Sequence, residues 1–124
     1  MISQPQIVLV ASEADQAEIR AVLQEHPWTF VWVGAGGQST LSQLAAQPRP
    51  QAAILCGELP NDDPQDVLSN LRETLGASVG VVFIAGRSGP FRNALDVRGL
   101  SIDQFVGRPL SETSLAYALR SVMS

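Results

Sequence analysis

The sequence predicts a single α/β domain with a doubly wound (βα)₅ architecture, in which five parallel strands alternate with five helices. Short apolar segments rich in β-branched residues alternate along the chain with stretches in which apolar residues recur every three or four positions. The chain has 124 residues, the usual size of one domain, and 45% of them are hydrophobic, which suits one core. Strands that alternate regularly with amphipathic helices form a parallel sheet covered on both faces.

Continuous apolar runs, too short for helices, predict the strands. A run without polar alternation is typical of a strand buried on both faces of a parallel sheet. The predicted strands are 6–11, 29–33, 51–55, 79–85 and 103–106.

A helix is predicted after each strand, where apolar residues recur every three or four positions. A capping residue precedes several of these segments. Ser12 is the predicted N-cap of the first helix, with Asp15 three residues later. Asp63 is placed to cap the third helix with Pro64 at its first position, and Ser111 to cap the last. The predicted helices carry their apolar residues within 19–23, 41–45, 67–75, 91–97 and 115–122.

Composition excludes several classes of function. The net charge is −4, and the eight arginines are scattered without any lysine, which argues against a direct nucleic-acid surface. The longest apolar runs are far shorter than the ~20 residues of a membrane span, so we expect no membrane span and a cytoplasmic location. Cys56 is the only cysteine, which excludes an internal disulfide, a Cys-x-x-Cys pair and a structural zinc site built on several cysteines.

The informative residues are expected in the loops after the first, third, fourth and fifth strands. In open parallel sheets, ligands bind beyond the carboxyl ends of the strands near the point where the strand order reverses. The glycines at 34–37 follow the second strand and lack the G-x-G-x-x-G spacing, so they predict a turn and not a phosphate-binding loop.

Two stretches of sequence carry a family resemblance. They are PQAAILCGELPNDDPQDVLSNLR at 50–72 and DQFVGRPL at 103–110. In these stretches and in its alternation of strands and helices, the chain resembles the receiver domains of bacterial response regulators from about residue 6 to residue 123. The resemblance implies the flavodoxin-like sheet order 2-1-3-4-5, a receiver-like domain over residues 5–124, and a place in two-component signal transduction or a phosphorelay. It also implies a cis bond at Arg108-Pro109.

The family's active positions are nearly all changed in this chain. The family's metal-binding acidic pair falls on Ala11 and Ser12, and its phosphoacceptor aspartate falls on Cys56. Its switch hydroxyl falls on Ala85 and its lysine on Arg108. Mg²⁺ usually takes one or two carboxylates from the protein, and a cysteine cannot form an acyl phosphate. We therefore predict no catalytic residues, no metal and no cofactor.

The resemblance then implies a degenerate pseudo-receiver that acts by protein–protein contact and is not an enzyme. Such domains are known in front of ParA/MinD-type pilus-assembly ATPases and of transcription regulators, so the expected partner is a protein, a covalently linked effector domain or a second copy. Two alternatives stay open. One is a receiver regulated by a small ligand or by phosphorylation of Glu58 or another unconventional acceptor. The other is a flavodoxin-like cofactor-binding protein with a phosphate at Ser12, where Glu13 and Asp15 would repel it.

The resemblance places the working surface on the fourth helix, the fifth strand and the last helix. Many receivers pair through this face, and we expect an exposed Phe and Leu to anchor it between charged groups. The alternative that Phe91 and Leu95 turn into the core stays open. The interface candidates are Phe91, Arg92, Leu95, Asp96, Arg98, Tyr117 and Arg120.

The remaining notable residues have simple structural interpretations. Cys56 is interpreted as a small buried hydrophobe at a strand end. Glu58 and Asp63 are interpreted as parts of a solvated acidic turn that ends in an N-cap. Trp28 and Trp32 are interpreted first as packing residues and second as interface anchors.

Overall fold

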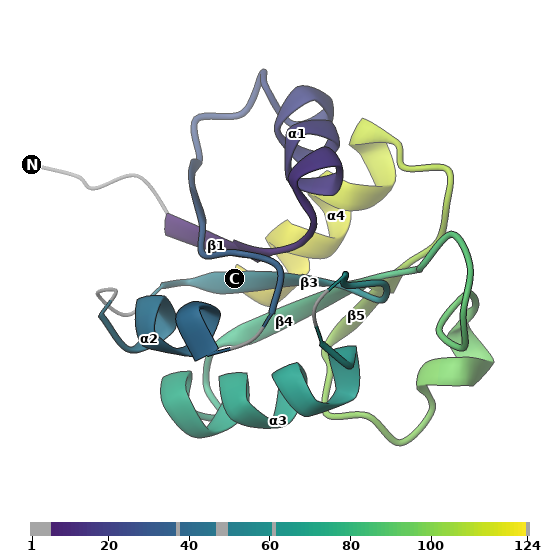
Figure 1. Cartoon of the computed structure of the whole chain (residues 1–124). Coiled ribbons are helices and arrows are strands. Elements are labelled where there is room, and N and C mark those ends of the chain that lie inside the picture. The colour runs from purple at the N-terminus through teal and green to yellow at the C-terminus, as the bar shows by residue number, and fades with distance from the viewer. Residues whose placement is uncertain (1–5, 37, 47–49, 61, 124) are drawn as a thin grey trace, which may run out of the picture.

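A five-stranded parallel sheet runs through the middle of the molecule, with helices on both of its faces (Figure 1). The computed structural model describes residues 6–36, 38–46, 50–60 and 62–123. The strand order is β2-β1-β3-β4-β5, and every neighbouring pair is parallel. The predicted fold class and strand order are thus confirmed. Residues 5 and 124, the predicted ends of the domain, lie outside the described residues.

The strands agree with their predicted ranges to one residue at either end. They are β1 (Gln6–Val10), β2 (Thr29–Trp32), β3 (Ala52–Cys56), β4 (Gly80–Ile84) and β5 (Gln104–Val106). The helices are α1 (Glu13–Val22), α2 (Gln38–Ala46), α3 (Pro64–Leu75) and α4 (Glu112–Met123), with a 3₁₀ turn, η1 (Ala94–Val97). Among the described residues, no helix is long and apolar enough to cross a membrane.

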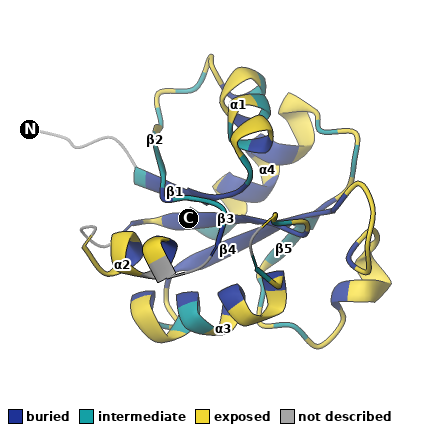
Figure 2. Ribbon diagram, viewed as in Figure 1, coloured by how far each residue is buried: buried dark blue, intermediate teal, exposed yellow. Residues whose placement is uncertain are grey.

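Alternate residues of each strand supply two cores, one on each face of the sheet. Ile7 and Leu9 pack with α1 and α4, whereas Val8 and Val10 pack with α2 and α3. Every residue of β3 and β4 is buried, and Figure 2 shows both strands dark blue between the helix layers. Burial on both faces accounts for the continuous apolar runs in the sequence.

The predicted caps form as hydrogen bonds. The Ser12 hydroxyl accepts from the Asp15 N–H at 3.1 Å, and the Asp63 carboxylate accepts from the Gln65 N–H at 2.8 Å. Pro64 occupies the first turn of α3, and the Ser111 hydroxyl accepts from the Ser114 N–H at the start of α4. Each cap satisfies a donor that the helix itself leaves unpaired. Because α1 follows β1 and α3 follows β3, these capped helices begin at the carboxyl edge of the sheet.

The predicted helix at 91–97 is wrong in its start and its type, since only a 3₁₀ turn at Ala94–Val97 forms. Asn93 is the N-cap and accepts from the Leu95 and Asp96 N–H groups, so the turn cannot begin earlier. Its other end is set at Arg98, whose ψ of 128° is extended. Gly99 follows with a φ of +88°, a conformation that favours glycine. The chain between β4 and β5 is therefore mostly loop.

Candidate functional site

The carboxyl edge of the sheet brings the predicted phosphorylation-site positions together. Ala11 directly follows β1, Cys56 ends β3 and Ala85 directly follows β4. All three are buried. Arg108 lies two residues beyond the end of β5, and its bond to Pro109 is cis, as predicted.

Cys56 is fully buried at the end of β3, which confirms its interpretation as a small buried hydrophobe. Burial raises the pKa of its thiol to about 12, and the negative charge of Asp15 contributes to the rise. The nucleophilic form of cysteine is the thiolate, so this side chain is protonated and inert near neutral pH.

Arg108 spans the space between β4 and α1. Its Nε donates to the Ala85 carbonyl at 2.7 Å, while Nη1 reaches Glu18 Oε1 at 3.0 Å and Nη2 reaches Asp15 Oδ1 at 3.2 Å. The Arg108 side chain is only 14% exposed and that of Asp15 only 4%. These charges are largely removed from water, so each needs its partners.

Arg87, from the loop after β4, binds the same two carboxylates. Its Nη1 donates to Asp15 Oδ1 at 2.6 Å and its Nη2 to Glu18 Oε1 at 2.9 Å. The hydrogen bond to Asp15 raises the pKa of Arg87 above its usual range. We call Asp15, Glu18, Arg87 and Arg108 the arginine–carboxylate network. It joins the start of α1 to the loops that follow β4 and β5.

The sequence analysis missed Glu18 and Arg87, and it placed Asp15 at the start of a helix without an arginine partner. The available signal was weak. Asp15 and Glu18 are three residues apart and so share one face of α1. Arg87 lies only two residues past the end of a buried apolar run and hence at the carboxyl edge of the sheet.

The network leaves little for a metal ion to bind. Both carboxylates are engaged by two guanidinium groups, which carry the positive charge that a divalent cation would otherwise bring. Within the part of the chain that the structure describes, no three His, Cys, Asp or Glu side chains gather in a way that could hold a metal ion.

The two tryptophans pack against the core, as predicted. The Trp32 indole N–H also donates to the Ala11 carbonyl at 2.8 Å, so this ring touches the backbone of the site. Trp28 stacks on His26 with ring centroids 4.4 Å apart.

Phe91 corrects the prediction of an exposed aromatic anchor. It is buried, and its ring meets the Phe83 ring edge-on with centroids 5.7 Å apart. This happens because the loop after β4 does not form a helix and folds over the core on the α2 and α3 side of the sheet. Leu95 and Tyr117 are 73% and 68% exposed, as the predicted surface requires. The Asp96 carboxylate accepts from the Arg92 and Asn93 N–H groups and holds the 3₁₀ turn.

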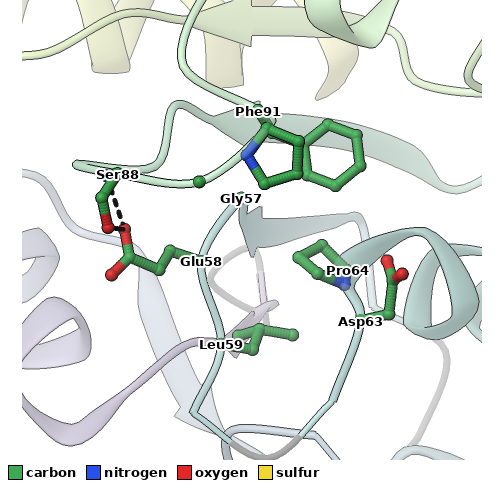
Figure 3. Close-up of a pocket in the computed structure, with 9 residues that line it drawn as sticks. Gly57, Glu58, Leu59, Asp63, Pro64, Ser88 and Phe91 are labelled. Atoms are coloured by element: carbon green, nitrogen blue, oxygen red, sulfur yellow. Dashed lines mark hydrogen bonds between the residues drawn. The ribbon is translucent and has the colours of Figure 1, made fainter.

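The acidic turn after β3 lies beside the network and flanks a cavity (Figure 3). Glu58 is exposed, and its Oε1 accepts from the backbone N–H of Ser88 at 2.8 Å and from the Ser88 hydroxyl at 3.2 Å. These bonds, the backbone one foremost, lower the pKa of Glu58. The carboxylate is therefore ionised at neutral pH.

Comparison with known proteins identifies the fold. No family model and no curated protein matches the sequence. Among solved structures, the chain is similar to the receiver domain of the sensor histidine kinase PA1611 from Pseudomonas aeruginosa PAO1, a structure with magnesium in its active-site cleft. The identity is 20%, the match covers 98% of each chain and the TM-score is 0.79. The fold is that of receiver domains.

Two further receiver structures support this assignment. A putative response regulator from Chloroflexus aurantiacus is 16% identical, with 98% of each chain covered and a TM-score of 0.81. The chemotaxis protein CheY4 of Vibrio cholerae is 14% identical, with 97% of this chain and 99% of that chain covered and a TM-score of 0.77. The receiver fold thus extends over nearly the whole chain.

Proposed function

We propose that this receiver-fold domain acts by binding protein and does not undergo aspartyl phosphorylation or catalyse a reaction. The observation that carries the proposal is the arginine–carboxylate network, together with Cys56 at the end of β3 where the family resemblance puts the phosphoacceptor. The network joins the start of α1 to the loops after β4 and β5 by internal charge pairs and needs no phosphoryl group to do so.

The chemistry at Cys56 supports the first half of this proposal. An acyl phosphate requires a carboxylate, and Cys56 offers a buried thiol whose pKa is raised to about 12 by burial. A protonated, enclosed thiol attacks phosphoryl donors poorly.

The state of the nearby carboxylates supports it further. Mg²⁺ binding here would have to detach Asp15 or Glu18 from charge-assisted hydrogen bonds to Arg87 and Arg108. The ion would also approach two guanidinium charges. Both effects oppose the octahedral oxygen coordination that Mg²⁺ requires.

The second half of the proposal concerns the exposed face made by η1, β5 and α4. Leu95 and Tyr117 are the most exposed large hydrophobic residues that the described ranges contain. A groove of about 440 Å³ runs between Phe105 of the edge strand β5 and Tyr117 of α4. We infer a second copy of the chain as the occupant of this face, since Arg92 and Arg98 flank Asp96 in the sequence and a two-fold contact would repeat each charge pair.

Phosphoryl transfer is tested by incubating the protein with acetyl phosphate and Mg²⁺ and measuring its intact mass. The expected result is no gain of a phosphoryl group. Cys56→Asp alone should also stay unlabelled, whereas Cys56→Asp combined with Ala11→Asp and Ser12→Asp restores the missing carboxylates and should gain labelling. Mg²⁺-dependent labelling of the unmodified protein would refute the proposal.

The contact surface is tested by sedimentation velocity across a range of protein concentrations. We expect self-association that Tyr117→Glu abolishes and that Glu73→Gln, on the exposed side of α3, leaves unchanged. A protein that is monomeric at all concentrations, or a dimer indifferent to Tyr117→Glu, would remove this face.

A further inference from the structure

A cavity of about 250 Å³ lies between the loop after β3 and the loop after β4. Its apolar lining includes Leu59, Pro64 and Phe91, and two carboxylates, Glu58 and Asp63, belong to its wall. In Figure 3 these acids stand on opposite sides of the view, with the apolar side chains between them. The cavity therefore combines an apolar lining with two carboxylate groups.

The walls of this cavity are held in place without a ligand. Glu58 is bonded to both the backbone and the side chain of Ser88, which ties the two loops together. Pro64 is buried in the first turn of α3, and Phe91 packs edge-on against Phe83. Gly57 allows the backbone after β3 to lie close to the Phe83 ring, since a Cβ at this position would be 2.8 Å from that ring. A pocket formed in advance loses little ordering entropy on binding.

Each of the two carboxylates accepts a hydrogen bond. Hydrogen bonds from Ser88 lower the pKa of Glu58, and Asp63 uses one oxygen to cap α3. Among the residues that the structure describes, neither forms an ion pair. The guanidinium of Arg87 contributes to the lowered pKa of Glu58, but its hydrogen bonds go to the network.

We propose that this cavity binds one arginine or lysine side chain from a basic segment of a protein partner. The volume is below the roughly 300–1,000 Å³ of cavities that hold drug-sized ligands, which suits a single side chain. The aliphatic stem packs on Leu59 and Phe91 while the charged end meets Glu58, and Asp63 on the opposite side adds attraction at longer range. Arginine is also enriched among the residues that dominate binding energy.

This inference rests on the protein-binding half of the proposed function and names the chemistry of the partner. The net charge of −4 favours approach of a basic segment. The cavity is lined neither by Cys56 nor by any residue of the groove at Tyr117, so the phosphoryl-transfer test, the sedimentation test and the test below can fail independently.

The probe is n-butylguanidinium, compared with n-butylurea, which has nearly the same shape and no charge. Both are titrated into the uniformly ¹⁵N-labelled domain and followed by amide NMR. We expect butylguanidinium to produce saturable shifts at the amides of residues 57–59, 88, 89 and 91, with butylurea several-fold weaker. Equal shifts by both probes, shifts confined to other residues, or no saturable shift would overturn the proposal.

Two charge-removing variants sharpen the test. Glu58→Gln should weaken butylguanidinium binding roughly two- to fivefold, as expected for one exposed ion pair, and leave butylurea unchanged. Asp63→Asn should act in the same direction while keeping the cap of α3, because Asn also caps well. Glu73→Gln removes an equal charge from the far end of α3 and should have no effect. A loss in Glu73→Gln equal to that in Glu58→Gln would show general charge attraction only and overturn the assignment.

Discussion

Two pairs of carboxylates lie near the same edge of the sheet, and they differ in whether a cation accompanies them. Asp15 and Glu18 are each bound by two arginines, and Asp15 is almost wholly buried. Glu58 and Asp63 flank a cavity and accept hydrogen bonds from Ser88 and from the Gln65 N–H, respectively. Neither has an ion-pair partner among the described residues.

This difference separates structural charge from charge that is open to a ligand. A buried carboxylate without a cation costs several kcal/mol, so Asp15 requires its arginines for the domain to be stable. An exposed carboxylate is solvated and costs little. The first pair therefore holds the start of α1 to two loops, and we propose that the second binds a basic group. The predictions below test each side of this comparison.

The largest effect is expected from removing the buried cation of the network. Arg108→Met keeps much of the apolar stem but leaves Asp15 with Arg87 alone, and Arg87 is 52% exposed. We expect the free energy of unfolding in urea to fall by about 2–3 kcal/mol, less than the roughly 3–5 kcal/mol of a fully broken buried pair, because Arg87 remains.

The matched control is Arg98→Met, which removes an exposed arginine outside the network and should change stability by less than about 0.5 kcal/mol. Adding Asp15→Asn to Arg108→Met should restore part of the loss, because the unpaired buried charge disappears. Equal losses in Arg98→Met and Arg108→Met, or strict additivity with Asp15→Asn, would contradict a structural network.

The second effect is a loss of stability at alkaline pH that depends on Cys56. Its folded pKa is raised to about 12 from an ordinary value near 9. Above pH 9 the unfolded chain loses the thiol proton and the folded chain keeps it. The unfolding free energy should therefore fall by roughly 1 kcal/mol per pH unit up to about pH 12.

Cys56→Ala isolates this contribution, because it removes the thiol and leaves every other titrating group. Its stability between pH 9 and 11 should decline less steeply than that of the wild type, measured by urea unfolding at each pH. Parallel pH profiles would mean that the thiol ionises as readily in the folded protein as in the unfolded chain.

A smaller effect is expected at the cap of α3, where Asp63 has both a structural and a charge role. Asp63→Ala removes the acceptor for the Gln65 N–H and should cost about 1 kcal/mol, whereas Asp63→Asn should cost only a few tenths. Thermal unfolding of both variants measures the difference. If both variants lost the same stability, the carboxylate charge and not the cap would be the stabilising feature.

The smallest effect concerns the tether of Glu58. Ser88→Ala removes the hydroxyl donor but keeps the backbone N–H, which is the main cause of the lowered pKa. The pKa of Glu58, followed by ¹³C NMR of its carboxyl group, should rise slightly and remain below its ordinary value. A full return to the ordinary value would assign the shift to the hydroxyl alone.

The fold was predictable from sequence because burial on both faces leaves a direct pattern. The apolar runs gave the strands, and local hydrogen bonding by Ser12, Asp63 and Ser111 gave the helix starts. The segment at 91–97 misled because its apolar spacing suited a helix. Asn93 and Gly99 restricted it to one 3₁₀ turn, and Phe91 turned into the core.

The site was only half predictable, for a physical reason. Ala11, Cys56 and Ala85, which the family resemblance indicated, lie buried at or next to the ends of strands. Arg87 was missed because it lies in a loop, and loop geometry decides which distant charge a long side chain reaches. Its pairing with Asp15, 72 positions away in sequence, appears only once the loop after β4 is positioned against α1.

The central claim, that the network takes the place of a metal and phosphoryl site, is tested most directly by titrating the unmodified domain with Mg²⁺. The Trp32 indole N–H is a suitable NMR reporter, because it donates to the Ala11 carbonyl at the edge of the site. We predict no saturable shift of this resonance, or of the amides of Ser12, Cys56 and Ala85, at millimolar Mg²⁺. A saturable shift of these resonances that Asp15→Asn abolishes would show that the carboxylates leave their arginines for a metal, and would contradict the account.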